Sequence, residues 1–352
     1  MTFTPDWRHM ADVAKNVRPA RLPLYEHTVS ANVMEEVLGT EFAGLAWGKD
    51  RDLDEYFRNY CRFYKEMTYD TVSFEVGVCP ILPGHGALSG GGPGPIQGRE
   101  DFEKYPWDEL PERYWSQAGP RFDALASALP PGMKIVGGVG YGVFEISEFL
   151  VGLEYLPFMM VDDPELYADL YDRIGDLHCA LWTEMLRRYR ESFVICRAGD
   201  DMGFRSSLLT TPATVRERVL PQYRRIIKIV HDAGLPFLLH SCGCIFEVMD
   251  DIIAAGIDAK HSNEDAIAPF DRWIADYGDR IGLMGGFDMD FLCTKSEGDI
   301  HEAVLEHGRR FRAAARGYAL GSGNSIPDYV PAGNYLAMVR AAQELRAEEA
   351  RG

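Results

Sequence analysis

The sequence predicts an α/β fold, a (β/α)8 TIM barrel, from two observations. Eight short runs rich in Val, Ile, Leu and Phe recur along the 352 residues, each flanked by polar or glycine-rich sequence. Segments with helical periodicity lie between them, and such strand–helix alternation is typical of a parallel sheet. Eight units favour a closed barrel, with a doubly wound open sheet as the alternative. Because no repeat or long linker divides the chain, we expect a single domain over residues 1–352.

The expected strands share apolar composition and short length, and they lie at 22–27, 71–76, 134–140, 193–198, 235–241, 258–262, 281–287 and 317–323. Between them, residues 297–315 repeat apolar side chains at the spacing of one helix face. A second helix is expected at 213–233, because it follows Pro212 and is terminated by Gly234.

Composition and charge narrow the class of protein. The chain has 36 Lys and Arg against 54 Asp and Glu, a formal net charge of −18, and 46% of its residues are hydrophobic. Such a chain can bury a sizeable core, which excludes disordered, collagen-like and disulfide-stabilised miniproteins. A negative surface repels phosphate backbones and anionic lipids, so we expect no nucleic-acid and no membrane partner.

The cysteines and the first residues indicate a cytoplasmic protein. Seven Cys, an odd number, are scattered over the chain, which favours reduced thiols over a disulfide framework. The start MTFTPDWRHMADVAK has no secretory signal pattern, and no run of 18 apolar residues occurs.

Polar side chains gather at the predicted carboxyl ends of the strands, where active sites of this fold lie. They are Glu26, His27, Glu75, Tyr141, Glu145, Asp200, Asp201, His240, Cys242, His261, Glu264, Asp288, Ser322 and Asn324. Any one of them can be structural, since strands must exit into solvated loops. The whole set predicts an active site at this end of the barrel.

The segment LPFLLHSCG indicates a metal site. An apolar strand ends at His240, and Cys242 follows two positions later, so an imidazole and a thiol can point to the same side. Nitrogen and sulfur are the ligands that zinc prefers. Glu264 follows the next strand and is the candidate third ligand, with water or substrate as the fourth. The alternative is a hydrogen-bonded histidine and a buried thiol. Cys244 competes as a ligand, but its spacing from Cys242 favours a structural role.

The segment Gly199-Asp200-Asp201 follows the fourth expected strand. Neighbouring carboxylates repel, so one can have a raised pKa suited to general acid or base catalysis, or can orient its neighbour. Equally, the two can cap a helix and stabilise a loop. Arg205 nearby can bind an anionic substrate group or pair with Asp201. The glycine-rich run at 89–95 lacks the ending of a phosphate-binding loop and is predicted to be a loop over the barrel mouth.

From Gly199 to about Ala342 the sequence resembles the uroporphyrinogen decarboxylase family, a (β/α)8 superfamily that includes cobamide-dependent methyltransferases. The motifs that carry the resemblance occur in order: GDDMGFRSSLLTTPATVRERVLPQYRRI, LPFLLHSCG, the loop after DAKHSNE, GLMGGFD and GYALGSGNSIPDYVPAGNYLAM. The amino-terminal half matches more weakly, through LPLYEH and GVFEISEFLVGLE.

The chain departs from the decarboxylases of this family at two places. It reads ARLPLYEHTVS where they have an arginine-rich segment that binds substrate carboxylates, and Ser322 stands where they have a histidine. The methyltransferase branch holds zinc on a His-x-Cys pair, which His240 and Cys242 match, and a related zinc site draws a glutamate from the next strand, as Glu264 would here. Those enzymes usually add a second cysteine after the last strand, where this chain has Ser322, Asn324 or Ser325.

The resemblance therefore implies a zinc-dependent methyltransferase that moves a methyl group between a small substrate and a corrinoid carried by a partner protein. In this scheme Asp200 or Asp201 orients the substrate or a water, Asp288 lines the pocket, and Asn324 provides a hydrogen bond. Members of the family often form homodimers. The alternative is a metal-free decarboxylase of a tetrapyrrole or another carboxylic acid, with Asp201 as the acid. A third alternative is a ligand-binding barrel without catalysis.

Overall fold

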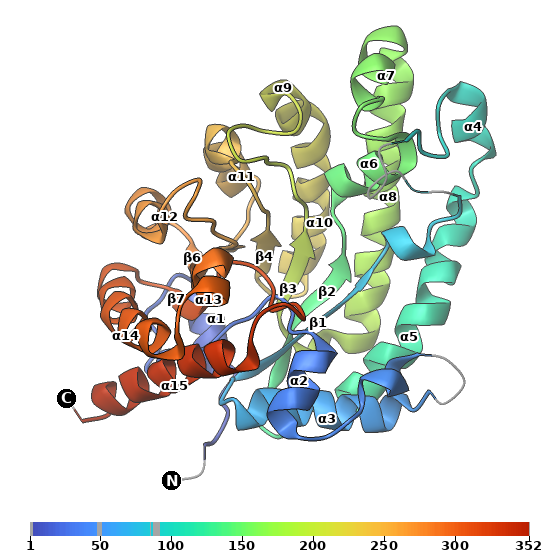
Figure 1. Cartoon of the computed structure of the whole chain (residues 1–352). Coiled ribbons are helices and arrows are strands. Elements are labelled where there is room, and N and C mark those ends of the chain that lie inside the picture. Colours follow the sequence, from blue (N-terminus) through green and yellow to red (C-terminus); the bar gives the residue numbers. More distant parts are fainter. Residues whose placement is uncertain (1–2, 48–50, 85, 87–91, 352) are drawn as a thin grey trace.

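The centre of the protein is a curved parallel sheet, seen in a computed structural model that describes residues 3–47, 51–84, 86 and 92–351 (Figure 1). Neighbouring strands in the sheet follow one another in the sequence, from β1 to β7. The strands are β1 (Thr71–Gly77), β2 (Lys134–Gly140), β3 (Phe193–Gly199), β4 (Phe237–His240), β5 (Ala259–His261), β6 (Gly282–Phe287) and β7 (Tyr318–Ser322). This sequential, all-parallel order is that of a (β/α)8 barrel and confirms the predicted fold class.

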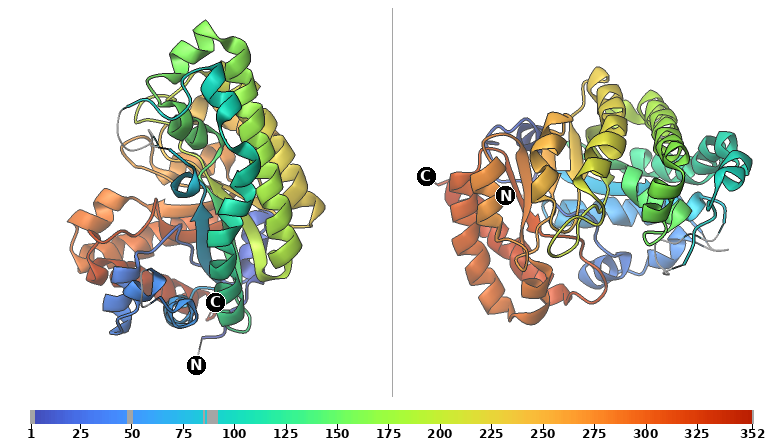
Figure 2. Two further views of the ribbon diagram at one scale, coloured as in Figure 1. Left: turned by 90° about the vertical axis from the view of Figure 1, so that its right-hand side faces the viewer. Right: turned by 90° about the horizontal axis from the view of Figure 1, so that it is seen from above.

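Helices connect the strands and, apart from α1, are arranged around the curved sheet (Figure 2). Before β2 they are α1 (Arg8–Ala14), α2 (Ala31–Leu38), α3 (Leu53–Glu66), α4 (Arg99–Lys104) and α5 (Leu110–Ala128). Between β2 and β5 they are α6 (Val143–Val151), α7 (Leu156–Asp162), α8 (Pro164–Tyr189), α9 (Pro212–Thr214), α10 (Leu220–Asp232) and α11 (Met249–Ala254). The last are α12 (Phe270–Tyr277), α13 (Met289–Thr294), α14 (Glu297–Ala314) and α15 (Ala332–Glu349).

The first expected strand, 22–27, is the strand that the sequence predicted incorrectly. Only Leu24 forms a bridge, a parallel one to Leu320 of β7. On its other side the carbonyl of His27 accepts hydrogen bonds from the side chains of Ser73 and Arg197, at 2.6 and 2.9 Å. The segment thus occupies the eighth position of the barrel, but long-range side chains replace a backbone ladder toward β1.

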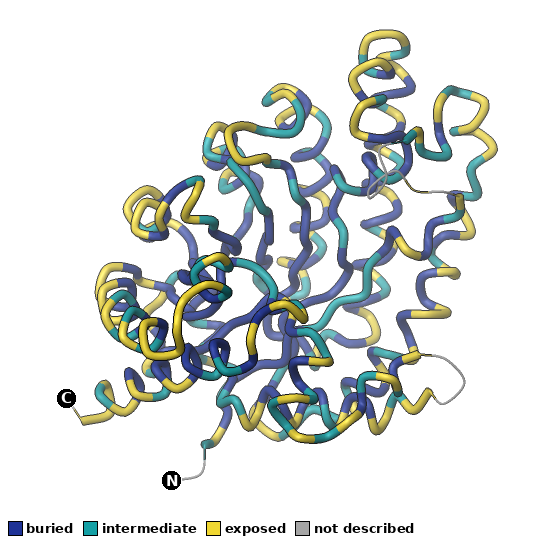
Figure 3. The backbone as a smooth tube through the Cα atoms, in the orientation of Figure 1, coloured by how far each residue is buried: buried dark blue, intermediate teal, exposed yellow. Residues whose placement is uncertain are grey.

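The interior of the barrel is closed at its amino-terminal end by α1. Residues of α1, among them Met10 and Val13, form one buried cluster with inward-facing strand residues such as Val136, Ile195 and Met284. A second, larger cluster fills the layer between the sheet and the outer helices. The strands are accordingly almost wholly buried, and exposed residues lie on the outer faces of the helices and in the loops (Figure 3). Several of the buried polar residues lie at or just after the carboxyl ends of strands, among them His240, His261 and Ser322.

The other seven expected strands are confirmed, with ends that differ by at most two residues. The helix expected at 297–315 is α14, and the one expected at 213–233 is α9 and α10 joined by a π-helical turn, Val215–Val219. The loop predicted at 89–95 lies in part, at 89–91, outside the described residues. Among the helices that the structure describes, none combines the length and apolar character needed to cross a bilayer.

Candidate metal centre and active site

Two histidines lie side by side at the carboxyl end of the barrel. The register pairs Gly199 of β3 with His240 of β4, and His240 with His261 of β5. Paired residues on neighbouring parallel strands project to the same face, so both imidazoles point into the barrel. Both are buried, and burial holds the pKa of His240 well below its usual value and lowers that of His261 to about 3. The two rings are therefore neutral at pH 7, the form in which histidine binds metals.

His240, Cys242 and Asp201 form a group of potential metal ligands. The Nε2 atom of His240 lies 3.3 Å from Sγ of Cys242 and 3.9 Å from Oδ1 of Asp201. One ligand atom from each of the three residues lies within 4.8 Å of the others. Nitrogen, sulfur and carboxylate oxygen are the donors of protein zinc sites, so these residues fit the metal that the sequence predicted.

The sulfur of Cys242 is surrounded by polar hydrogens. The amide of Asn324 donates to it at 3.2 Å, and the hydroxyl of Ser262 at 3.6 Å. Burial raises the pKa of the Cys242 thiol to about 12, and the negative charge of Asp201 is the next largest cause of this shift. A bound cation would reverse this, because a metal favours the thiolate. The two donors would then stabilise a charged sulfur.

A close approach of two loops places Asp201 over Cys242. A Cβ atom on Gly203 would lie 2.6 Å from the backbone nitrogen of Cys244, and Gly243 has a φ of +78°. Glycine is therefore needed at both positions. The loops are joined by hydrogen bonds from the Cys242 amide to Oδ1 of Asp201, at 2.8 Å, and from the Cys244 amide to the Phe204 carbonyl, at 2.7 Å. Cys244 thus contributes its backbone to this contact.

Glu264, the third ligand proposed from the sequence, contacts the residue that follows Cys242. Its Oε1 accepts a hydrogen bond from the Gly243 amide at 3.2 Å. In the described part of the chain, the groups of three potential ligands that include His240 and Cys242 contain Asp201 and not Glu264. The structure therefore adds Asp201 to the candidate ligands, and the sequence signal for it was its place after β3.

A pocket of about 430 Å³ opens beside this centre. Glu264, Asp288 and Asn324 line it, and Arg205 and Tyr329 complete its wall. Asp288 also caps α13, because its carboxylate accepts from the Asp290 amide at 2.7 Å and from the Asp265 amide at the same distance. The pocket borders the candidate metal centre through Asn324, whose amide donates to Sγ of Cys242.

Asp200 is placed differently from its neighbour. It is fully buried, and its carboxylate accepts from the amides of Phe144 and Glu145, at 3.1 and 2.9 Å, and from the hydroxyl of Tyr223 at 2.9 Å. Burial raises its pKa to about 6 in spite of these three donors. Asp200 thus caps the first turn of α6 from a distant loop.

Two glutamates of α6 add to the acidic character of the barrel mouth. Burial, together with the nearby Asp200 and Asp201, raises the pKa of Glu145 to about 9 and that of Glu148 to about 8. Both are therefore protonated at pH 7. The sequence pointed to Glu145 by its position after β2, whereas nothing in the local pattern distinguished Glu148.

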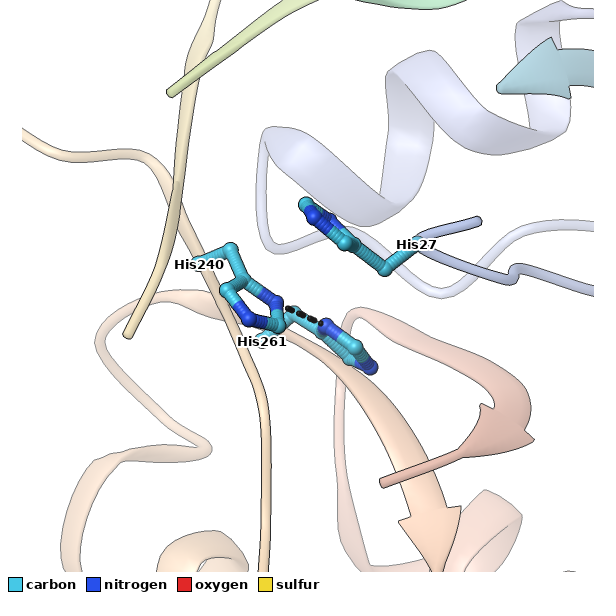
Figure 4. Close-up of side chains that lie close together, drawn as sticks. All are labelled: His27, His240 and His261. Atoms are coloured by element: carbon cyan, nitrogen blue, oxygen red, sulfur yellow. Dashed lines mark hydrogen bonds between the residues drawn. The ribbon is translucent and has the colours of Figure 1, made fainter. Parts of the chain in front are cut away.

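Other buried polar groups near the centre were not assigned a role from the sequence. Arg197 of β3 lies in the barrel interior and pairs with Glu75 at 2.8 Å. The imidazole of His27 stacks on that of His240, with ring centroids 3.8 Å apart. His27 and His261 were recognised only as strand ends, because their relation to His240 depends on strand register rather than on spacing along the chain (Figure 4).

Comparisons with known proteins agree with this architecture. The sequence model of the family described as uroporphyrinogen decarboxylase (URO-D) matches residues 94–345. A methyltransferase from Methanosarcina mazei superposes with a TM-score of 0.75 at 16% identity, over 96% of this chain and 98% of that one. A glycoside hydrolase family 5 enzyme from Prevotella bryantii reaches 0.48 at 8% identity, over 97% and 100%. At these identities the structural likeness concerns the fold alone. The comparison with curated proteins finds no match.

Proposed function

Because the chain belongs to the uroporphyrinogen decarboxylase family, we propose that it is a zinc-dependent methyltransferase of that family. In this proposal it moves a methyl group between a small substrate and a corrinoid carried by a partner protein. One observation carries the proposal: Nε2 of His240, Sγ of Cys242 and the Asp201 carboxylate converge at the mouth of the barrel. The fold shared with a methyltransferase supports it.

His240, Cys242 and Asp201 would hold the zinc, and Glu264 is the proposed further ligand from the neighbouring loop. When bound, zinc polarises the heteroatom that carries or accepts the methyl group, which makes it a better leaving group or a better nucleophile. Asn324 donates to the Cys242 sulfur and thereby fixes its position. No second cysteine follows β7, so oxygen ligands or the substrate complete the coordination.

The remaining residues of the pocket would orient the substrate. Asp288 keeps the wall of the pocket in place, because both of its oxygens accept backbone amides. Arg205 also lines the pocket, and its positive charge is suited to an anionic group of the substrate. Asp200 acts on this site indirectly, by holding the loop that carries Asp201 against α6.

Two measurements test the proposal. Elemental analysis of the purified protein should find one zinc per chain, and the protein should demethylate free methylcobalamin when a suitable thiol or phenol acceptor is present. Cys242→Ala should lose both zinc and activity. The matched control is Cys179→Ala, because Cys179 lies on α8, outside the centre. An active protein that binds no zinc and tolerates Cys242→Ala would refute the proposal.

A second candidate is decarboxylation of a carboxylic acid without a metal, with Asp201 as the acid. The protonated Glu145 favours it, because a neutral carboxyl group beside Asp201 can resupply a proton after loss of CO2. Release of CO2 that persists after chelation of metals would support this candidate. Demethylation of methylcobalamin that the chelator abolishes and zinc restores, without release of CO2, would support the methyltransferase instead.

A further inference from the structure

A direct contact joins the rings of His240 and His261. Their Nδ1 atoms lie 2.8 Å apart, and Figure 4 shows the two rings facing each other across this contact. Two ring nitrogens at this distance share one proton, because two bare nitrogens would repel and two N–H groups would clash. Which ring carries the proton follows from the other nitrogen of His261.

The second nitrogen of His261 determines the tautomers. Its Nε2 lies 3.0 Å from the backbone carbonyl of Ser322, and a carbonyl can only accept a hydrogen bond. His261 therefore carries its proton on Nε2. A neutral imidazole has a single N–H, so Nδ1 of His261 is bare and accepts the proton of His240 Nδ1. The remaining nitrogen of His240, Nε2, is then bare and faces Sγ of Cys242.

The carbonyl at the end of this chain of hydrogen bonds is held in place. The amide of Ser322 donates to the buried Glu26 carboxyl group at 3.1 Å, and the Ser322 hydroxyl donates to the same group. The next residue, Gly323, donates its amide to the Phe287 carbonyl at 2.6 Å. Strand β7 thus presents a fixed acceptor to His261.

A metal site made of three histidines is the competing interpretation, because ligand atoms of His27, His240 and His261 also lie within 4.8 Å of one another. The geometry disfavours it. The rings of His27 and His240 are stacked, with 22° between their planes, and the lone pairs of stacked rings point in parallel directions and do not converge. His261 is also engaged on both ring nitrogens, since its Nε2 faces the Ser322 carbonyl at 3.0 Å and its Nδ1 faces Nδ1 of His240 at the length of a hydrogen bond.

We propose that His261 is the positioning residue of the metal centre, which holds His240 as its Nδ1–H tautomer and so presents Nε2 to the zinc. The hydrogen-bond chain runs from the Ser322 carbonyl through His261 to His240. Metal-bound histidines commonly donate their second N–H to a carboxylate, carbonyl or water, and here another histidine takes that place. The inference rests on the proposed zinc site, but the tautomers that it specifies exist without metal.

The tautomers are measured first, in the metal-free wild-type protein. Long-range ¹H–¹⁵N correlation spectra of ¹⁵N-histidine-labelled protein distinguish protonated from bare ring nitrogens. His240 should show a protonated Nδ1 and a bare Nε2, and His261 the reverse. Assignment uses the loss of one signal set in His240→Ala and His261→Asn. A His261 ring protonated on Nδ1 would overturn the inference whether or not the protein binds zinc.

Zinc affinity is measured next, by competition with a chromophoric chelator. His261→Leu removes the acceptor and should weaken zinc binding about 10- to 100-fold. His261→Asn keeps an acceptor oxygen near the place of Nδ1 and should restore affinity to within a few fold. The matched control is His27→Phe, which keeps a ring stacked on His240 and should leave affinity unchanged.

The outcomes separate the proposed zinc-dependent function from the proposed positioning role of His261. If the wild-type protein binds no zinc, the proposed function fails and the spectra alone decide the tautomers. If the wild-type protein binds zinc and His261→Leu binds it equally well, the positioning role fails and the proposed function stands. If His27→Phe weakens binding as much as His261→Leu, the effect is general packing, and the positioning role is again refuted.

Discussion

Replacing Asp200 separates a structural role for this residue from a catalytic one. Its carboxylate accepts three buried hydrogen bonds, from the Phe144 and Glu145 amides and from the Tyr223 hydroxyl. Asp200→Ala leaves the three donors without a partner, and each buried unsatisfied group costs ~1–3 kcal/mol, with partial relaxation. We expect the free energy of unfolding to fall by about 3–5 kcal/mol. Asp200→Asn keeps one acceptor oxygen and should lose about 1–3 kcal/mol.

The assay is urea denaturation at pH 7, followed by tryptophan fluorescence and circular dichroism together. Tyr223→Phe removes a single hydrogen bond and should cost about 1 kcal/mol. In the double variant with Asp200→Ala the cost should not add, because the two residues share that bond. A loss of less than 1 kcal/mol for Asp200→Ala would refute the reasoning. If Asp200→Asn is folded but inactive, while its zinc content is unchanged, the catalytic role predicted from the sequence is supported instead.

Three further predictions follow from the same structure. Asp201→Asn should weaken zinc binding about 10-fold or more in chelator competition, and more than Glu264→Gln does; the reverse order would make Glu264 the principal carboxylate ligand. Burial raises the pKa of Glu26 to about 8. The protonated side chain therefore contributes fully to the free energy of unfolding below pH 4.5, and this contribution is lost as the pH rises to 8. Glu26→Gln should therefore flatten the fall in the free energy of unfolding between pH 5 and 8, measured in urea, and an identical pH dependence in both proteins would contradict this. Gly142→Ala would place a Cβ atom 2.2 Å from that of Asp200 and should cost ~1–3 kcal/mol, whereas Gly298→Ala, with nothing nearer than 3.9 Å, should change thermal stability little.

Strand positions could be predicted from the sequence where local composition decides them. Runs such as 134–140 and 281–287 are apolar and end at glycine or a polar loop, so pattern alone locates them. The segment 22–27 has the same composition, but Pro23 lacks an N–H, and the carbonyls of Leu22 and His27 are bound by side chains distant in the sequence. The local sequence gives no information about these distant side chains, so it could not show that this segment forms a single bridge instead of a strand.

The candidate site likewise contains residues that local spacing could predict and residues that only tertiary contacts bring together. His240 and Cys242 are two positions apart at a strand end, and this local spacing places them together. Asp201 comes over Cys242 only because the loops containing Gly203 and Gly243 pack backbone against backbone. The contact of His261 with His240 requires the register of β4 with β5, and β5 is only three residues long. Both are tertiary contacts, which cannot be predicted from the pattern of residues along one segment.

The electrostatics of the barrel mouth bear on the choice between the two candidate reactions. Arg197, the cation in the barrel interior, is already paired with Glu75, and Arg205 provides positive charge in the pocket. Burial first, and then repulsion from Asp200 and Asp201, raise the pKa of Glu145 to about 9, so this carboxyl group holds its proton at pH 7. A divalent cation beside Asp201 relieves the same repulsion, whereas a porphyrinogen with several carboxylates increases it. The charges that surround His240 and Cys242 therefore favour a metal centre and a small substrate over a polyanionic one.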